Sequence, residues 1–395
     1  MHVPFTRRLG SLAAIALSAT AVGAVTAASA SAAATLYVNG SIAPRHDDTS
    51  CTSASYTTLG AAVTAAAPGS KIVVCAGTYR EDVTVSKPLT IVGQQATVNA
   101  TGLINGFTIP TPGAGSRIEG FTVIEAIGEG VLAVSTNHVS ILHNVIENND
   151  QGGTVANTYA ECQAQGQIPG DCGEGVHLMS TTDSRVIGNV IKYNSGGVLL
   201  SDEIGPTDNN IVASNWVGDN ASDCGITLAG HNPAGAPNGV PNPAAGGVYD
   251  NLITGNVAIG NGLLGQGAGV VLAAGIPIGG GAVYSNTVSR NILRGNGLAG
   301  VTVHNHVPGQ DLNGNKIIDN QIGTNNLDGD PDFAPVIDPS TTGIFVGTAT
   351  PLQITIEHNV ISSNVYDVFL TGPVSANNIE LTNVFTSDTH EVFGT

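Results

Sequence analysis

The chain has 395 residues, of which 42% are hydrophobic but only 4% aromatic, and it contains 52 glycines. Charged residues make up 11%, which excludes a charge-rich disordered chain and leaves Val, Ile, Leu and Ala to build the core. The formal charge of −18 argues against nucleic acid and membrane surfaces as partners, because both are anionic.

The N-terminal segment has the features of a secretory signal peptide. Arg7 and Arg8 precede an Ala-rich apolar run, and small residues at Ala30-Ser31-Ala32 form an A-x-A cleavage site. The run is only weakly apolar, which argues against a retained membrane anchor. We therefore expect residues 1–34 to be removed and residues 35–395 to form one secreted domain.

Five cysteines follow this leader. In an exported protein, cysteine pairs are expected to be disulfides, and the spacing suggests Cys51 with Cys75 and Cys162 with Cys172. Cys224 is left over and precedes an aliphatic strand. A nucleophile is one interpretation of Cys224, but a buried thiol that packs as a small hydrophobe is favoured.

Residues 35–93 look like a cap followed by a first coil. The stretch from Ser55 to Gly93 reads as one amphipathic helix, ended by Pro68-Gly69, and then three short strands. We expect the helix to cover the open end of the first coil.

The segment from 94 to 373 is repetitive. A pattern N-x-Φ-x-x-N, where Φ is aliphatic or Ala, recurs at 144–149, 189–194, 215–220, 256–261, 291–296, 320–325 and 359–364. A G-V-x-L-like strand follows each copy, and 22 residues separate Gly175 from Gly197. This period predicts an all-β, single-stranded parallel β-helix with coils of about 22 residues, in which the corner Asn side chains form ladders. Residues 374–395 form its C-terminal end.

These motifs resemble a known family. A helix, then PGSKIVV, GTYRE and VTVSKPLTIVG, followed by N-x-I-x-x-N coils, is similar to the secreted right-handed β-helix repeat proteins of the pectin-lyase-like superfamily. The resemblance is to the branch that includes NosD-type periplasmic proteins and mannuronan epimerases. It implies a right-handed β-helix over nearly all of the mature chain. It leaves the activity open, because the superfamily includes lyases, hydrolases, esterases, epimerases and non-enzymes.

The long insertions all flank the G-V-x-L strands, so we expect the outer face of those strands to form a substrate groove. The outward position x carries one titratable residue, His177, in a mostly apolar row. Coil alignment stacks Glu203 with His231, and Glu129 with Glu174. Histidines and paired carboxylates can move protons during lyase or epimerase chemistry, and the alternative is that they are ordinary solvated turn residues. The candidate catalytic residues are Glu174, His177, Asp202, Glu203, His231 and His304.

An acidic loop suggests a metal. Asp328, Asp330 and Asp332 place carboxylates at alternate positions, as Ca²⁺-binding loops do, although the twelve-residue loop pattern is not completed. We treat Ca²⁺ as the candidate cofactor.

The predicted function is that of a secreted, monomeric carbohydrate-active protein that acts on an extracellular polysaccharide, as a lyase, an epimerase or a glycoside hydrolase. The alternative is a non-catalytic extracellular scaffold or glycan-binding protein, which the apolar outer row favours.

Overall fold

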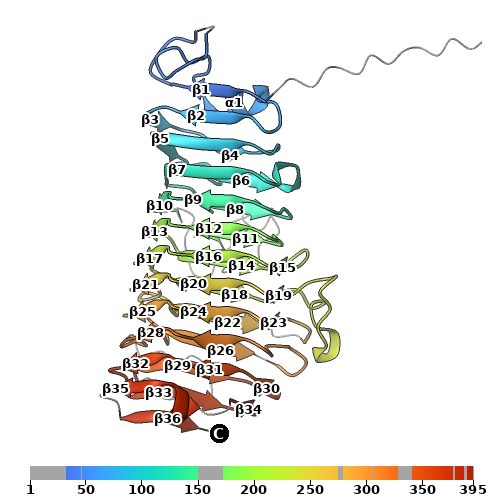
Figure 1. Cartoon of the computed structure of the whole chain (residues 1–395), viewed down its shortest axis with the longest axis vertical. Coiled ribbons are helices and arrows are strands. Elements are labelled where there is room, and N and C mark those ends of the chain that lie inside the picture. Colours follow the sequence, from blue (N-terminus) through green and yellow to red (C-terminus); the bar gives the residue numbers. More distant parts are fainter. Residues whose placement is uncertain are drawn as a thin grey trace, which may run out of the picture. The chain divides into compact units, whose positions relative to one another are not determined.

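The computed structural model describes residues 33–45, 47–149, 172–274, 279–305, 307–327, 340–376, 379–386 and 389–394. Between residues 33 and 394 these segments wind as a parallel β-helix, in which each strand pairs in parallel with its counterpart in the next coil. Figure 1 shows the coils following one another in chain order from β1 to β36. The predicted fold class is therefore confirmed.

Three faces make up each coil. The first face consists of β1 (Thr35–Val38), β2 (Lys71–Val74), β5 (Thr90–Asn99), β7 (Arg117–Ile124), β9 (Ser140–Leu142), β12 (Arg185–Ile187), β16 (Ile211–Ala213), β20 (Leu252–Thr254), β24 (Thr287–Ser289), β27 (Lys316–Ile318) and β31 (Thr355–Glu357). The second face shares β5 and β7 and adds β3 (Gly77–Tyr79), β10 (Val145–Glu147), β13 (Val190–Lys192), β17 (Trp216–Gly218), β21 (Val257–Ile259), β25 (Ile292–Arg294), β28 (Gln321–Ile322), β32 (Val360–Ser362) and β35 (Val384–Thr386).

The third face carries the G-V-x-L motifs. Its strands are β4 (Val83–Thr84), β6 (Phe107–Pro110), β8 (Val131–Val134), β11 (Glu174–Met179), β14 (Gly196–Ser201), β18 (Ile226–Ala229), β22 (Val270–Ala274), β26 (Val301–Asn305), β29 (Thr342–Gly347), β33 (Tyr366–Thr371) and β36 (His390–Gly394). Inserted segments beside it form two small sheets, which consist of β15 (Thr207–Asp208), β19 (Val248–Tyr249) and β23 (Val283–Tyr284), and of β30 (Leu352–Gln353) and β34 (Val374–Ser375).

Helix α1 (Leu59–Ala65) lies where the cap was predicted and packs on β1, β2 and β4. The Glu81 carboxylate accepts the backbone N–H groups of Leu59 and Gly60, at 2.7 and 2.8 Å, at the start of the helix. At the other end, Lys87 Nζ donates to three backbone carbonyls at 2.7–3.0 Å. Opposite charges thus satisfy both ends of a helix too short to be stable alone. The other helices within the described residues are α3 (Ile379–Thr382) and the 3₁₀ turns Thr111–Gly113 and Pro237–Gly239.

The interior is a continuous aliphatic core. On β14, Val198 and Leu200 point inward and are almost fully buried, as the period-two pattern predicts. Close packing explains the glycine that opens each G-V-x-L strand. A Cβ at Gly175, for example, would lie 2.3 Å from Ile191 Cγ2. A side chain at Gly175 would therefore clash with the second face of the same coil.

Asparagine ladders run along the corners, as predicted. In one ladder each Nδ2 donates to the Oδ1 of the next Asn at 2.9–3.1 Å, through residues Asn144, Asn189, Asn215, Asn256, Asn291, Asn320, Asn359 and Asn383. These side chains are buried, and the backbone N–H of each of the first seven also bonds to the next Oδ1. A second ladder starts at Asn149 and a third at Asn210. The Asn repeat is therefore scaffold.

The cysteines largely follow the prediction. Cys51 and Cys75 form a disulfide, and Cys172 is disulfide-bonded, while its predicted partner Cys162 lies outside the described residues. Cys224 is a free, buried thiol in an apolar cluster with Val271 and Leu298. Burial raises its pKa well above the usual value, which supports the packing interpretation.

The predicted signal peptide falls almost entirely on residues that are not described. Among the residues that are described, no helix combines the length and the apolar character needed to cross a bilayer.

Candidate functional site on the third face

The predicted site residues come from successive strands of the third face. Glu174 and His177 lie on β11, Glu203 follows β14, and His231 follows β18. The strands pair in register, with His177 beside Leu199 and Ser201 beside Ala229. This register brings Glu203 next to His231, as the coil alignment predicted.

His177 is the centre of a buried polar chain. Its Nε2 lies 2.7 Å from Ser201 Oγ and its Nδ1 lies 3.4 Å from Glu129 Oε1. All three residues have essentially no exposed surface. A buried imidazole with a carboxylate on one nitrogen and a hydroxyl on the other has its orientation fixed on both sides.

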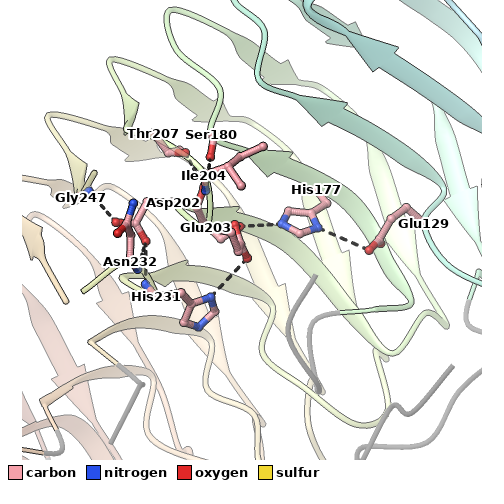
Figure 2. Close-up of polar contacts among 11 residues, drawn as sticks. Glu129, His177, Ser180, Asp202, Glu203, Ile204, Thr207, His231, Asn232 and Gly247 are labelled. Carbon is pink, nitrogen blue, oxygen red and sulfur yellow. Dashed lines mark hydrogen bonds and ion pairs between the residues drawn. The ribbon is translucent and has the colours of Figure 1, made fainter. Parts of the chain in front are cut away.

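The chain continues outward from Ser201. Its hydroxyl donates to Glu203 Oε2 at 2.6 Å, and Glu203 Oε1 lies 3.3 Å from His231 Nδ1. Figure 2 shows Glu129, His177, Glu203 and His231 arranged in series. The His231 and Glu203 side chains are 9% and 5% exposed, so the chain reaches solvent at this end.

The charge of Glu203 is set by its neighbours. Burial by itself raises the pKa of Glu203, but the hydrogen bond from His231, the charges of His177 and His231 and the Ser201 hydroxyl outweigh it. The net effect holds the pKa of Glu203 well below its usual value, so it is an anion at neutral pH.

Glu174 supports the inner end of the chain. Its backbone N–H donates to Glu129 Oε2 at 2.7 Å, which confirms the predicted stacking of the two GEGV segments. Its own carboxylate is buried over Gly196, where an added Cβ would lie 2.2 Å from Glu174 Oε2. A glycine at 196 is thus required for this carboxylate to lie where it does.

Asp202 points away from the chain of polar contacts. Its Oδ1 accepts the backbone N–H groups of His231 and Asn232, at 2.6 and 2.9 Å, and its Oδ2 accepts that of Gly247. Burial raises the pKa of Asp202 to about 6, although the three N–H donors act in the opposite direction. In this geometry Asp202 fastens the segment after β18 to the end of β14 and so fixes the backbone of His231.

His304 is placed apart from the other candidates. It lies on β26 at the register of Ala273, and Ala273 is at the register of Ala229. Two strand spacings correspond to about 10 Å. The third face therefore gathers five of the six candidates around β11, β14 and β18, and leaves His304 beyond them.

The outer row of the third face is more enclosed than the sequence suggested. Leu132, His177, Leu199 and Thr302 are all buried, so the row does not form an open groove at these positions. The accessible polar end is instead the Glu203–His231 pair beyond the strand ends.

Two contributors were absent from the sequence-based candidate set. Ser201 follows the GVLL strand directly, and Glu129 was recognised only as the partner of Glu174. The signals that could have found them are the outward phase of Ser201, two residues after Leu199, and the repeated GEGV segment.

Metal ligands are not evident among the described residues. Asp328, Asp330 and Asp332 lie outside that part of the chain. Within it, no group of three or more His, Cys, Asp or Glu side chains is placed to hold a metal ion.

Comparison with known proteins supports the fold. Residues 112–263 match the model of a family described as periplasmic copper-binding protein (NosD). A crystal structure of pectate lyase Pel9A aligns with a TM-score of 0.54 at 16% identity, and covers 91% of this chain and 80% of that chain. The chain therefore shares the parallel β-helix fold with this pectate lyase.

Two further structures show weaker similarity. An alginate lyase from Paenibacillus sp. str. FPU-7 has a TM-score of 0.47 at 14% identity, over 92% of this chain and 98% of that chain. The A-module of the mannuronan C-5 epimerase AlgE4 from Azotobacter vinelandii has a TM-score of 0.40 at 15% identity, over 83% and 91%. Comparison with curated proteins gave no match.

Proposed function

We propose that this protein is a secreted carbohydrate-active enzyme that acts on an extracellular polysaccharide, with His231 as its proton-transfer group. The observation that carries the proposal is the contact between His231 Nδ1 and Glu203 Oε1 at 3.3 Å, at the accessible end of a buried polar chain. A histidine oriented by an ionised carboxylate is a common general base. The fold similarity to a pectate lyase supports a polysaccharide as the substrate class.

The arrangement favours proton abstraction over hydrolysis. Glycoside hydrolysis needs two carboxyl groups on either side of the scissile bond, but Asp202 is occupied by three backbone N–H groups. Abstraction of the proton next to a uronate carboxylate needs one base. In such a reaction His231 Nε2 takes the proton, and the resulting carbanion either expels the glycosidic oxygen, as in a lyase, or is reprotonated from the other side, as in an epimerase.

Copper is not part of this proposal. The matching family is described as copper-binding, but the described residues do not offer a set of three His, Cys, Asp or Glu ligands, and copper sites use such donors. A Ca²⁺ ion bound by Asp328, Asp330 and Asp332 remains a prediction from the sequence.

Secretion is proposed on two grounds. The first is the leader-like segment at residues 1–34, and the second is the Cys51–Cys75 disulfide, which is typical of exported proteins.

The alternative is a non-catalytic scaffold or glycan-binding protein. The burial of Glu129, His177 and Ser201 favours it, because a satisfied buried polar network can serve only to specify the fold.

Product analysis on a panel of uronate and neutral polysaccharides separates these possibilities. Absorbance of unsaturated products reports β-elimination, reducing ends report hydrolysis, and NMR of the sugar signals reports epimerisation. We expect activity on a uronate polymer that is lost in His177→Ala and Glu203→Ala. If wild type and both variants are equally inert across the panel while glycan binding persists, the protein is the non-catalytic alternative.

A further inference from the structure

We propose that Glu129, His177 and Ser201 are positioning residues that hold Glu203 as an oriented anion for His231. This inference rests on the function proposed above, and it concerns three fully buried residues that lie deeper than the Glu203–His231 pair.

The first step is the direction of the Ser201 hydroxyl. A serine hydroxyl has a single proton, and Ser201 donates it to Glu203 Oε2 at 2.6 Å. The contact of Ser201 Oγ with His177 Nε2 at 2.7 Å must then be donated by the ring. The proton of this imidazole is thereby placed on Nε2.

The second step is the charge of His177. Its other nitrogen, Nδ1, faces Glu129 Oε1 at 3.4 Å, while Glu129 Oε2 accepts the backbone N–H of Glu174 at 2.7 Å. With Glu129 ionised, Nδ1 is the donor of this contact, and two nearby carboxylates stabilise the charged ring. The charge of His177 is also among the causes that lower the pKa of Glu203, so we assign His177 as an imidazolium. A positive ring thus lies buried between the two carboxylates of Glu129 and Glu203.

The third step is the consequence for His231. An anionic Glu203, fixed through Oε2 by Ser201, accepts from His231 Nδ1 with Oε1. The tautomer of His231 is then set, and Nε2 carries the lone pair that takes a proton from substrate. The buried array therefore determines which nitrogen of His231 acts as the base.

The test follows the Glu203 carboxyl itself, by ¹³C NMR of protein labelled at Glu side chains, with the signal assigned through Glu203→Gln. In wild type we expect this signal to stay ionised as the pH falls to about 3. In Ser201→Ala and His177→Gln we expect its midpoint to rise by about one pH unit or more, because a donor or an opposite charge has been removed.

Ser289→Ala is the matched control. Ser289 is also a buried serine on a strand, and its hydroxyl donates one bond, to Thr254 Oγ1 at 3.0 Å. It lies on the first face, so this variant should leave the Glu203 titration unchanged. Ser201→Thr retains the hydroxyl and should restore the wild-type titration.

Ser201→Ala is sufficient for the test even if His177→Gln does not fold. The next strand carries Ala229 at the same register, so we expect alanine to be tolerated at position 201. A folded Ser201→Ala protein whose Glu203 titrates as in wild type would overturn the inference. The measurement needs no substrate. If no polysaccharide is converted but the Glu203 titration shifts in the variants, only the proposed function is rejected. If wild type is active but the Glu203 titration does not shift in the variants, only this inference is rejected.

Discussion

Ser201 Oγ lies 2.7 Å from His177 Nε2 across two adjacent parallel strands. His177 pairs with Leu199, so Ser201 is its diagonal neighbour, two residues along β14 on the same outward phase. This relationship links a fully buried Glu129–His177 pair to the accessible Glu203–His231 pair, and it turns separate polar residues into one connected chain.

The Asn ladder should contribute strongly to stability. Asn256 accepts the backbone N–H and the side-chain Nδ2 of Asn215, at 3.0 and 2.9 Å. Asn256→Ala would leave both buried donors without that acceptor, which should lower the free energy of unfolding by about 3 kcal/mol. Chemical denaturation measures this. The exposed Asn137→Ala should change stability by less than about 0.5 kcal/mol, and equal effects of the two variants would contradict a structural role for the ladder.

Asp202 should make stability depend on pH in a specific direction. Burial raises the pKa of Asp202 to about 6 in the folded protein, so the folded state binds the proton more tightly than the unfolded state. The stabilisation that protonated Asp202 gives the folded state is fully present below the ordinary Asp pKa, and it is lost as the pH rises through about 6.

The comparison that checks this is wild type against Asp202→Asn, which does not titrate. The stability advantage of wild type should shrink between pH 4 and pH 7, by about 1.4 kcal/mol for each unit by which the pKa is raised. An advantage that stays constant or grows over this range would show that the three N–H donors, rather than burial, control the carboxyl.

The capping contacts of α1 give a local prediction. Glu81→Ala removes the acceptor of two helix N-terminal N–H groups, so it should cost about 1–2 kcal/mol and speed amide exchange in residues 59–62. Glu391→Ala, at an exposed position near the other end of the β-helix, should do neither. Unchanged exchange in α1 would mean that packing alone holds the helix.

Much of the fold could be predicted because residues close together in the sequence define the strands and corners of each coil. The five-residue return of Asn and the G-V-x-L strands defined the corners and the inward phase, and both agree with the ladders and with the buried Val198 and Leu200. The adjacency of Glu203 and His231 followed from the same coil alignment.

The site could be predicted only in part, because its contacts depend on side-chain directions at strand ends. Asp202 and Glu203 are consecutive, yet one bonds loop backbone and the other bonds His231. His177 is fully buried, and alternation along a strand predicts which face a side chain lies on but not whether that face is covered.

The most direct test of the central claim compares His231→Gln with His358→Gln on the polysaccharide that wild type converts. His358 is an exposed histidine at a corner of another coil, so its variant controls for the loss of one imidazole. Loss of a general base should reduce turnover by about 100-fold or more in His231→Gln, with His358→Gln at the wild-type rate. Wild-type turnover in a folded His231→Gln protein would contradict the assignment of His231 as the proton-transfer group.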